Sequence, residues 1–246
     1  MPELREPRLR DAYRLHRNEN HPLGELPDEA IRKIGAQIIY MLYTGRVDMT
    51  GDDWGRIFAE SIGAEALGSP LGIADVVKGR CAWSLKTVKA NRPSETTSVR
   101  LISGRCSPDY SYGIENPHDD IQRTGDAVLA IYNSRVQISY RDHSPVRTLV
   151  LVRSPDLLNF LVFEKELHEY NLSDYTWTEN KQGNFIGKNS VGVHCFTWQP
   201  HGSQFTIVEP VPDNAIKFSV RKPPSLSLET ALRTMQFDDS WVTIQR

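Results

Sequence analysis

Two short apolar runs separated by a glycine-containing turn constrain the fold of this chain more than any other feature. The first run covers about 73–77 and the second about 81–90, with Gly79 in the turn between them. Runs of this length joined by a tight turn predict a β-hairpin. In such a hairpin Asp75 and Lys86 lie side by side across the two strands. A carboxylate beside an ammonium group can help to hold a divalent metal and an attacking water against a phosphate.

Helices and strands are predicted on both sides of this hairpin. Asp28 is expected to cap a helix over about 29–43, because a short polar side chain accepts hydrogen bonds from free N–H groups at a helix start. Thr50 is expected to cap a second helix over about 52–67 in the same way. The other predicted elements are strands at about 98–103, 147–153 and 159–167, a helix at about 119–138, β-rich runs at 191–198 and 204–211, and a short helix at about 226–235.

The order of these elements, a helix, three strands, a helix and a strand, resembles the αβββαβ core of the PD-(D/E)xK nuclease superfamily, the fold of most type II restriction endonucleases. The resemblance covers about 52–167. It implies an α/β (α+β) fold with a restriction-endonuclease-like core, a mixed central sheet and a β-rich C-terminal region. The expected parts are an N-terminal arm and helix (1–50), the nuclease core (51–167) and a possible DNA-reading region (168–246), together forming one compact domain.

The resemblance also implies roles for individual residues. Asp75 would bind Mg²⁺, and Lys86 would orient or deprotonate the attacking water. The family usually carries a carboxylate two residues before the lysine, where this chain has Ser84. A second carboxylate must then come from another element, and Glu60 on the preceding helix is the first choice as metal ligand and catalytic residue.

Other acidic residues remain open as the second carboxylate. Each of them, taken alone, is more simply explained as a solvated helix or loop residue. Two of them stand at a helix start, where the helix dipole alone favours acids. These candidates are Glu65, Glu95, Glu115, Asp119 and Asp120.

Residues that could contact DNA lie on several segments. Lys86 and Lys89 are three apart, so they point to opposite faces of a strand, and Lys89 is expected to face solvent or backbone phosphate. Arg100 and Arg105 bracket the end of the strand at 98–103 and are as readily explained by a charged strand exit. Amide side chains can bond base edges in the major groove. Three residues between 194 and 206 are therefore candidates for base contacts, although a β-sheet corner explains them equally well: Gln199, His201 and Gln204.

Composition limits the function without deciding it. The net charge is −2 and the sequence pI is about 6.4, so a basic nucleic-acid surface would have to be local. An odd count of three cysteines without a CxxC pair argues against a disulfide framework or a zinc ribbon. No run is long enough to span a bilayer and the N-terminus is charged, which predicts a cytoplasmic protein with no membrane partner.

The sequence therefore predicts a Mg²⁺-dependent endonuclease that hydrolyses phosphodiester bonds in double-stranded DNA, in the manner of a type II restriction enzyme. A homodimer is expected, since a palindromic target mirrors two-fold protein symmetry. Two alternatives stay open. One is a structure-specific or repair nuclease with the same core, and the other is a non-catalytic DNA-binding module that lost its carboxylate at Ser84.

Overall fold

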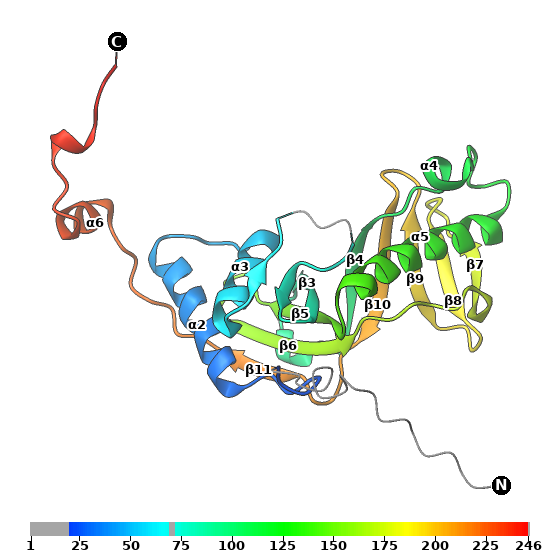
Figure 1. Cartoon of the computed structure of the whole chain (residues 1–246), viewed down its shortest axis with the longest axis horizontal. Coiled ribbons are helices and arrows are strands. Elements are labelled where there is room, and N and C mark those ends of the chain that lie inside the picture. Colours follow the sequence, from blue (N-terminus) through cyan, green and yellow to red (C-terminus); the bar gives the residue numbers. More distant parts are fainter. Residues whose placement is uncertain (1–19, 69–71, 246) are drawn as a thin grey trace, which may run out of the picture.

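A computed structural model of the 246-residue chain describes residues 20–68 and 72–245, and all structural statements below concern these residues. Two β-sheets carry the fold (Figure 1). The first has the strand order β1-β2-β3-β5-β6-β11, and the second has the order β4-β10-β9-β8-β7. The chain is an α+β protein with a mixed sheet, because β3 and β5 are parallel while the other neighbours in the first sheet are antiparallel.

Helices α2 (Asp28–Tyr43) and α3 (Gly51–Ile62) cover one face of the first sheet. Thr50 caps α3 as expected, and its hydroxyl exchanges hydrogen bonds with Asp53 in a capping box. Two expectations are wrong. The N-cap of α2 is Pro27 rather than Asp28. The second helix stops at Ile62 rather than at about 67, because Gly63 adopts the left-handed conformation that ends helices (φ 64°).

The first sheet contains the predicted hairpin. After α3 the chain forms β1 (Glu65–Ala66), β2 (Val76–Lys78) and β3 (Cys81–Lys89), which pair as an antiparallel meander. The long helix α5 (Ile121–Asp142) then leads to β5 (Val146–Arg153), which lies parallel to β3. β6 (Asn159–Glu166) and β11 (Ile216–Ser219) complete the sheet.

The strand predicted at about 98–103 does not belong to the first sheet. It forms β4 (Ser98–Arg105), which pairs with β10 (Gln204–Pro210) in the second sheet and has no ladder with β3. The third strand of the meander is the two-residue β1, which had been assigned to a helix. The second sheet is completed by β7 (Tyr175–Glu179), β8 (Phe185–Asn189) and β9 (His194–Gln199), of which β7 and β8 were not predicted.

Helix α5 packs across the inner face of the second sheet (Figure 1). Asp120 caps it, accepting a hydrogen bond from the N–H of Arg123 at 2.9 Å. The helix approaches β7 so closely that a Cβ on Gly125 would lie 2.1 Å from Cγ of Trp177. A short helix α4 (Pro108–Tyr112), in a segment expected to be a loop, precedes α5.

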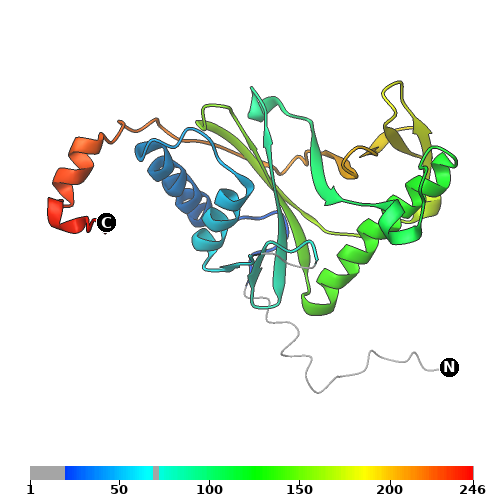
Figure 2. The same cartoon turned by 90° about the horizontal axis from the view of Figure 1, so that it is seen from above.

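Each sheet contains a strand from the other side of the expected boundary at 167. β4 comes from the first part of the chain and pairs in the second sheet, while β11 comes from the last part and pairs in the first sheet. The C-terminal segment then leaves the body of the molecule and carries α6 (Leu228–Thr234), close to the short helix predicted there (Figure 2). The regions 51–167 and 168–246 are therefore interlocked.

Candidate catalytic site

Strand β3 presents different chemistry on its two faces. Trp83 and Leu85 point into the core beneath α2 and α3. Ser84 and Lys86 point to the other face, where they line the same small cavity. This is the alternation of an extended strand, and it places Lys86 between the two sheets rather than on an outer surface.

Asp75 is held against β3 by its own backbone and side chain. Its N–H donates to the carbonyl oxygen of Trp83 at 2.7 Å, and its Oδ2 accepts a hydrogen bond from the N–H of Leu85 at 2.6 Å. These two bonds fix the carboxylate beside the residue that precedes Lys86. The hairpin thus brings Asp75 and Lys86 together, as the sequence predicts.

The two charged groups influence each other electrostatically. Burial lowers the pKa of Lys86, and the Arg135 guanidinium lowers it further, while the Asp75 carboxylate opposes the change. Burial raises the pKa of Asp75, while Lys86 and the Leu85 N–H oppose that rise. No ion pair within 4.0 Å joins these two described residues.

The acid of α3 that acts on Asp75 is Asp52, at the start of the helix, and its negative charge raises the pKa of Asp75. Asp52 is exposed and was not among the sequence candidates. Glu60 is not brought to Asp75. Its Oε2 accepts a hydrogen bond of 2.6 Å from Gln37 on α2, and it lines an open cavity between the two helices.

The other acidic candidates also lie on separate elements. Glu65 is an exposed residue of β1, and Glu95 forms an exposed ion pair with Arg92 at 2.9 Å. Asp120 caps α5, and it lines a surface cavity with Glu115 and Asp119. Within residues 20–68 and 72–245, no three His, Cys, Asp or Glu side chains come close enough together to hold a metal ion by themselves.

Ser84, at the position where the resemblance would place a carboxylate, is fully buried. Its hydroxyl has no hydrogen-bond partner among the described protein groups. It lines a cavity that offers about 20 Å³ to the centre of a water molecule, together with Lys86, Ser103 and Thr148. This is room for about one water, which could satisfy the hydroxyl.

Helix α5 connects this site to the second sheet. Arg135 donates a hydrogen bond of 2.7 Å from Nη1 to the carbonyl oxygen of Ser103 on β4. One turn further along, the Ser139 hydroxyl accepts a hydrogen bond of 2.9 Å from the N–H of Ile73, just before Asp75. One face of α5 therefore fixes both the segment that carries Asp75 and the end of β4.

Three of the expected DNA contacts form a row on the second sheet. Gln204 pairs with Arg105 on one side and with Gln199 on the other. A bulge in β4 makes this register possible: Gly104, at φ 91°, shifts the strand so that Arg105 shares a face with Gln204. Sequence spacing alone could not show this row, because its members come from three strands.

The remaining DNA candidates lie apart from that row. His201 is exposed in the turn between β9 and β10. Arg100 is on β4 and donates a hydrogen bond of 2.9 Å to the Thr197 hydroxyl. Lys89 pairs with Asp48 at 2.9 Å, on the side of β3 opposite to Lys86.

Comparisons with known proteins found no matching family model, no matching curated protein and no matching solved structure. Among the residues that the structure describes, no helix is both long enough and apolar enough to cross a membrane.

Proposed function

We propose that this protein is a Mg²⁺-dependent endonuclease that hydrolyses phosphodiester bonds in double-stranded DNA. The observation that carries the proposal is that Asp75 and Lys86, on adjoining segments of one hairpin, act electrostatically on each other, while Lys86 lines the small cavity between the two sheets. An amine with a lowered pKa beside a carboxylate with a raised pKa marks a candidate functional site. Surface lysines with no catalytic role do not usually combine these properties.

The topology around the pair supports the proposal. The elements α3, β1, β2, β3, α5 and β5 follow one another in the order of an αβββαβ core, and β5 lies parallel to β3. In this interpretation β4 is an insertion between the meander and the crossover helix. The strand expected at 98–103 is replaced by β1 as the third member of the meander.

The donor set fits a hard divalent ion shared with a substrate. Mg²⁺ is commonly bound through one or two carboxylates, with phosphate oxygens and waters completing its shell. Asp75 would supply the first carboxylate and Asp52 the second, in place of the expected Glu60. When bound, the ion would polarise the scissile phosphate and favour ionisation of a water.

Lys86 would act on the attacking water. Because its pKa is lowered, its amine is closer to the neutral form that can accept a proton. In its charged form it would offset negative charge that develops on the phosphate. Arg135, fixed to the Ser103 carbonyl, adds positive charge near the same pair.

Contacts to DNA bases would come from the row formed by Arg105, Gln204 and Gln199. Arginine bonds guanine and glutamine bonds adenine through two hydrogen bonds each, and the three side chains lie on neighbouring strands. His201 in the adjoining turn and Arg100 on β4 would extend this surface toward the DNA backbone. A two-fold dimer would present two such rows to a palindromic site.

The decisive experiment is the incubation of the purified protein with long duplex DNA, with and without Mg²⁺. We expect discrete fragments from the wild-type protein, none from Asp75→Asn or Lys86→Met, and a smaller loss from Lys89→Met. Lys217→Met, on the exposed edge strand β11, is the matched control and should cleave normally. Normal cleavage by Asp75→Asn would remove the proposed site. A smear of products would indicate a structure-specific or repair nuclease instead of a restriction enzyme.

A non-catalytic DNA-binding module is the second candidate. It is favoured by Ser84 at the usual carboxylate position and by the absence of a three-acid group among the described residues. Binding of duplex DNA without cleavage at any Mg²⁺ concentration would establish it. In that case Gln204→Ala should weaken binding to the preferred sequence by roughly 1–3 kcal/mol, while Asp75→Asn should not.

A further inference from the structure

The C-terminal segment carries an unusual concentration of exposed apolar side chains. We define the arm as residues 225–245, which contain α6 and the turn η3 (Asp239–Trp241). Leu228, Ala231, Leu232 and Met235 follow the i, i+3, i+4, i+7 spacing of a single apolar helix face. Six large apolar side chains of the arm are exposed, by 36–75%: Leu228, Met235, Phe237, Trp241, Val242 and Ile244.

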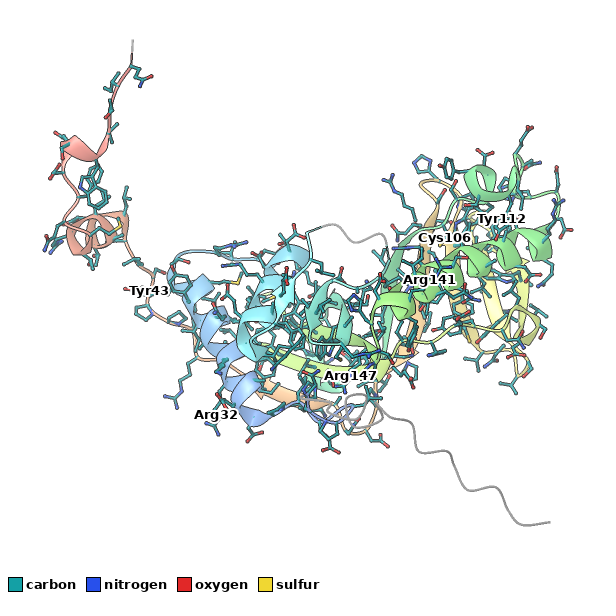
Figure 3. All side chains as sticks on the ribbon, in the orientation of Figure 1. Arg32, Tyr43, Cys106, Tyr112, Arg141 and Arg147 are labelled. Atoms are coloured by element: carbon teal, nitrogen blue, oxygen red, sulfur yellow. The ribbon has the colours of Figure 1, made fainter. Side chains whose placement is uncertain are left out.

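The arm contacts the body at its start and then diverges from it. The N–H of Leu226 donates to the carbonyl oxygen of Tyr43 at the end of α2, with a distance of 2.9 Å. Figure 3 labels Tyr43 at this point of departure. Pro223 and Pro224 precede the contact and keep the chain extended. Figures 1 and 2 both show α6 standing clear of α2.

An isolated helix of seven residues is not stable in water. Within the arm, the apolar contact between Phe237 and Trp241 is an edge-on pair with ring centroids 5.7 Å apart. A single such pair cannot hold a seven-residue helix in place. The arm therefore needs another surface against which to bury its apolar face.

The charge of the arm excludes two kinds of surface. Its described residues carry Glu229, Asp238 and Asp239 against a single cation, Arg233. Nucleic acid repels such a segment. Helices that lie on membranes carry lysine and arginine on their polar face instead. A protein surface with apolar and basic groups is the matching chemistry.

The chain itself offers that surface on α2. Ile39, Tyr40 and Val47 are exposed by 37%, 61% and 81% near the C-terminal end of α2. Toward the start of the same helix lie the exposed cations Arg32, which points away from the body in Figure 3, and Lys33, which pairs with Glu29 at 2.8 Å. An open cavity between α2 and α3 adjoins Tyr40. This α2 surface combines exposed apolar side chains with the exposed cation Arg32, as the arm requires.

We propose that the arm of one chain docks on the α2 surface of a second copy, and that the two copies exchange arms around a two-fold axis. Phe237 and Trp241 still expose 36% and 59% of their surfaces, out of the roughly 150–250 Å² that an enclosed aromatic side chain buries. Two arms exchanged together would approach the roughly 1,600 Å² of a standard stable interface, which one arm cannot reach. Each copy gives its arm to the other and receives the other's arm on its own α2 surface, so the assembly closes as a dimer. It depends on the fold alone and not on the proposed nuclease activity.

The test measures the mass of the full chain in solution by light scattering over a range of concentrations. We expect twice the 28.0 kDa of one chain. A chain ending after Pro224 and the double variant Phe237→Ser/Trp241→Ser should have the mass of one chain, with a dimer Kd at least about 30-fold higher. At concentrations where the full protein is also a single chain, their melting temperatures should equal that of the full protein, because the arm contributes nothing to the core of one chain. Thr234→Ala, on the polar face of α6, is the matched control and should remain dimeric.

A complementation experiment separates arm exchange from contact between two arms. Tyr40→Glu removes the receiving surface and should also yield single chains. Mixing this variant with the chain that ends after Pro224 restores one arm and one intact α2 surface, so a weaker mixed dimer should form. A full chain that stays monomeric, a shortened chain that stays dimeric, or a mixture that forms no mixed dimer would each overturn the proposal.

Discussion

Burial and two opposing charges act on Lys86, and each of the two charges can be removed separately by a substitution. Burial and Arg135 lower the pKa of Lys86, and Asp75 raises it. Arg135→Met should therefore move the Lys86 pKa upward, and Asp75→Asn should move it downward. Titration of the lysine ¹⁵Nζ resonances measures both shifts. Shifts in the same direction would show that the three groups do not interact as the geometry indicates.

A second buried carboxylate ties the first sheet together. Glu164 on β6 accepts a hydrogen bond of 2.7 Å from the Trp83 indole N–H, and its Oε2 lies 3.3 Å from Arg147 and 2.9 Å from His21. Burial alone would raise the pKa of Glu164, but His21, Trp83 and Arg147 outweigh it and the net pKa is lowered. Glu164→Gln leaves Arg147 buried without its counter-ion, which should cost roughly 3–5 kcal/mol.

The pH dependence of stability follows from the same shift. A carboxyl group whose pKa is lower in the folded state stabilises the fold above its unfolded pKa, and this contribution is lost as the pH falls through the folded value. The wild-type protein should therefore lose stability as the pH falls below 4.5, the ordinary pKa of a glutamate side chain. Glu164→Gln should lose less over that range in chemical denaturation. Glu95→Gln, at an exposed ion pair, should change stability by less than about 0.5 kcal/mol and keep the wild-type pH profile.

At the level of single residues, the sequence predicted that Asp75 and Lys86 lie near each other, because this depends only on a hairpin and on strand alternation. It could not identify Asp52, whose proximity depends on how α3 packs against the sheet. Asp52 and Glu60 are eight residues apart, or roughly 12 Å along a helix axis. Asp52, at the start of α3, acts on Asp75, whereas Glu60 is hydrogen-bonded to Gln37 on α2. The metal-ligand role of either acid stays a prediction.

Among the elements, α5 approaches its sheet closely at Gly125. The absence of a side chain at Gly125 admits the Trp177 ring, which a Cβ would meet at 2.1 Å. Gly125→Ala should therefore destabilise the protein by at least about 1–3 kcal/mol, although alanine favours helices. Gly55→Ala on α3 is the matched control, because nothing lies within 4 Å of its added Cβ. It should stabilise the protein by roughly 0.5–1 kcal/mol in the same thermal denaturation. Equal effects at both positions would contradict the packing of α5.

Element types were easier to predict than element partners. Apolar alternation identified β6 with its two faces: Phe160 and Val162 lie in one core cluster, and Leu161 and Phe163 in another. The pattern of β4 is equally regular, but alternation does not reveal which strand it pairs with. Its partner β10 lies about a hundred residues further along the chain, and long-range pairing of this kind is set by tertiary packing.

At the scale of the whole molecule, the two sheets form one folding unit. They are joined because β4 and β11 each pair in the sheet that the other part of the chain mainly supplies. Removing residues 168–246 would take β10 from β4 and β11 from β6. It would also uncover the face of α5 that packs on the second sheet, which includes Val128, Leu129 and Tyr132. Uncovering each such side chain costs roughly 1.5–3 kcal/mol. The summed loss is comparable with the roughly 5–15 kcal/mol that stabilises a typical domain.

A chain that ends after Leu167 should therefore fail to fold, even though it contains the whole αβββαβ order of elements. It should show no cooperative thermal transition and no dispersed amide resonances. A chain that ends after Pro224 keeps both sheets and should melt as the full protein does at concentrations where both are single chains. A cooperative transition in the shorter chain would mean that the first sheet and its helices form an independent domain. The second sheet would then be an attached module, and strand exchange would only connect two units that fold separately.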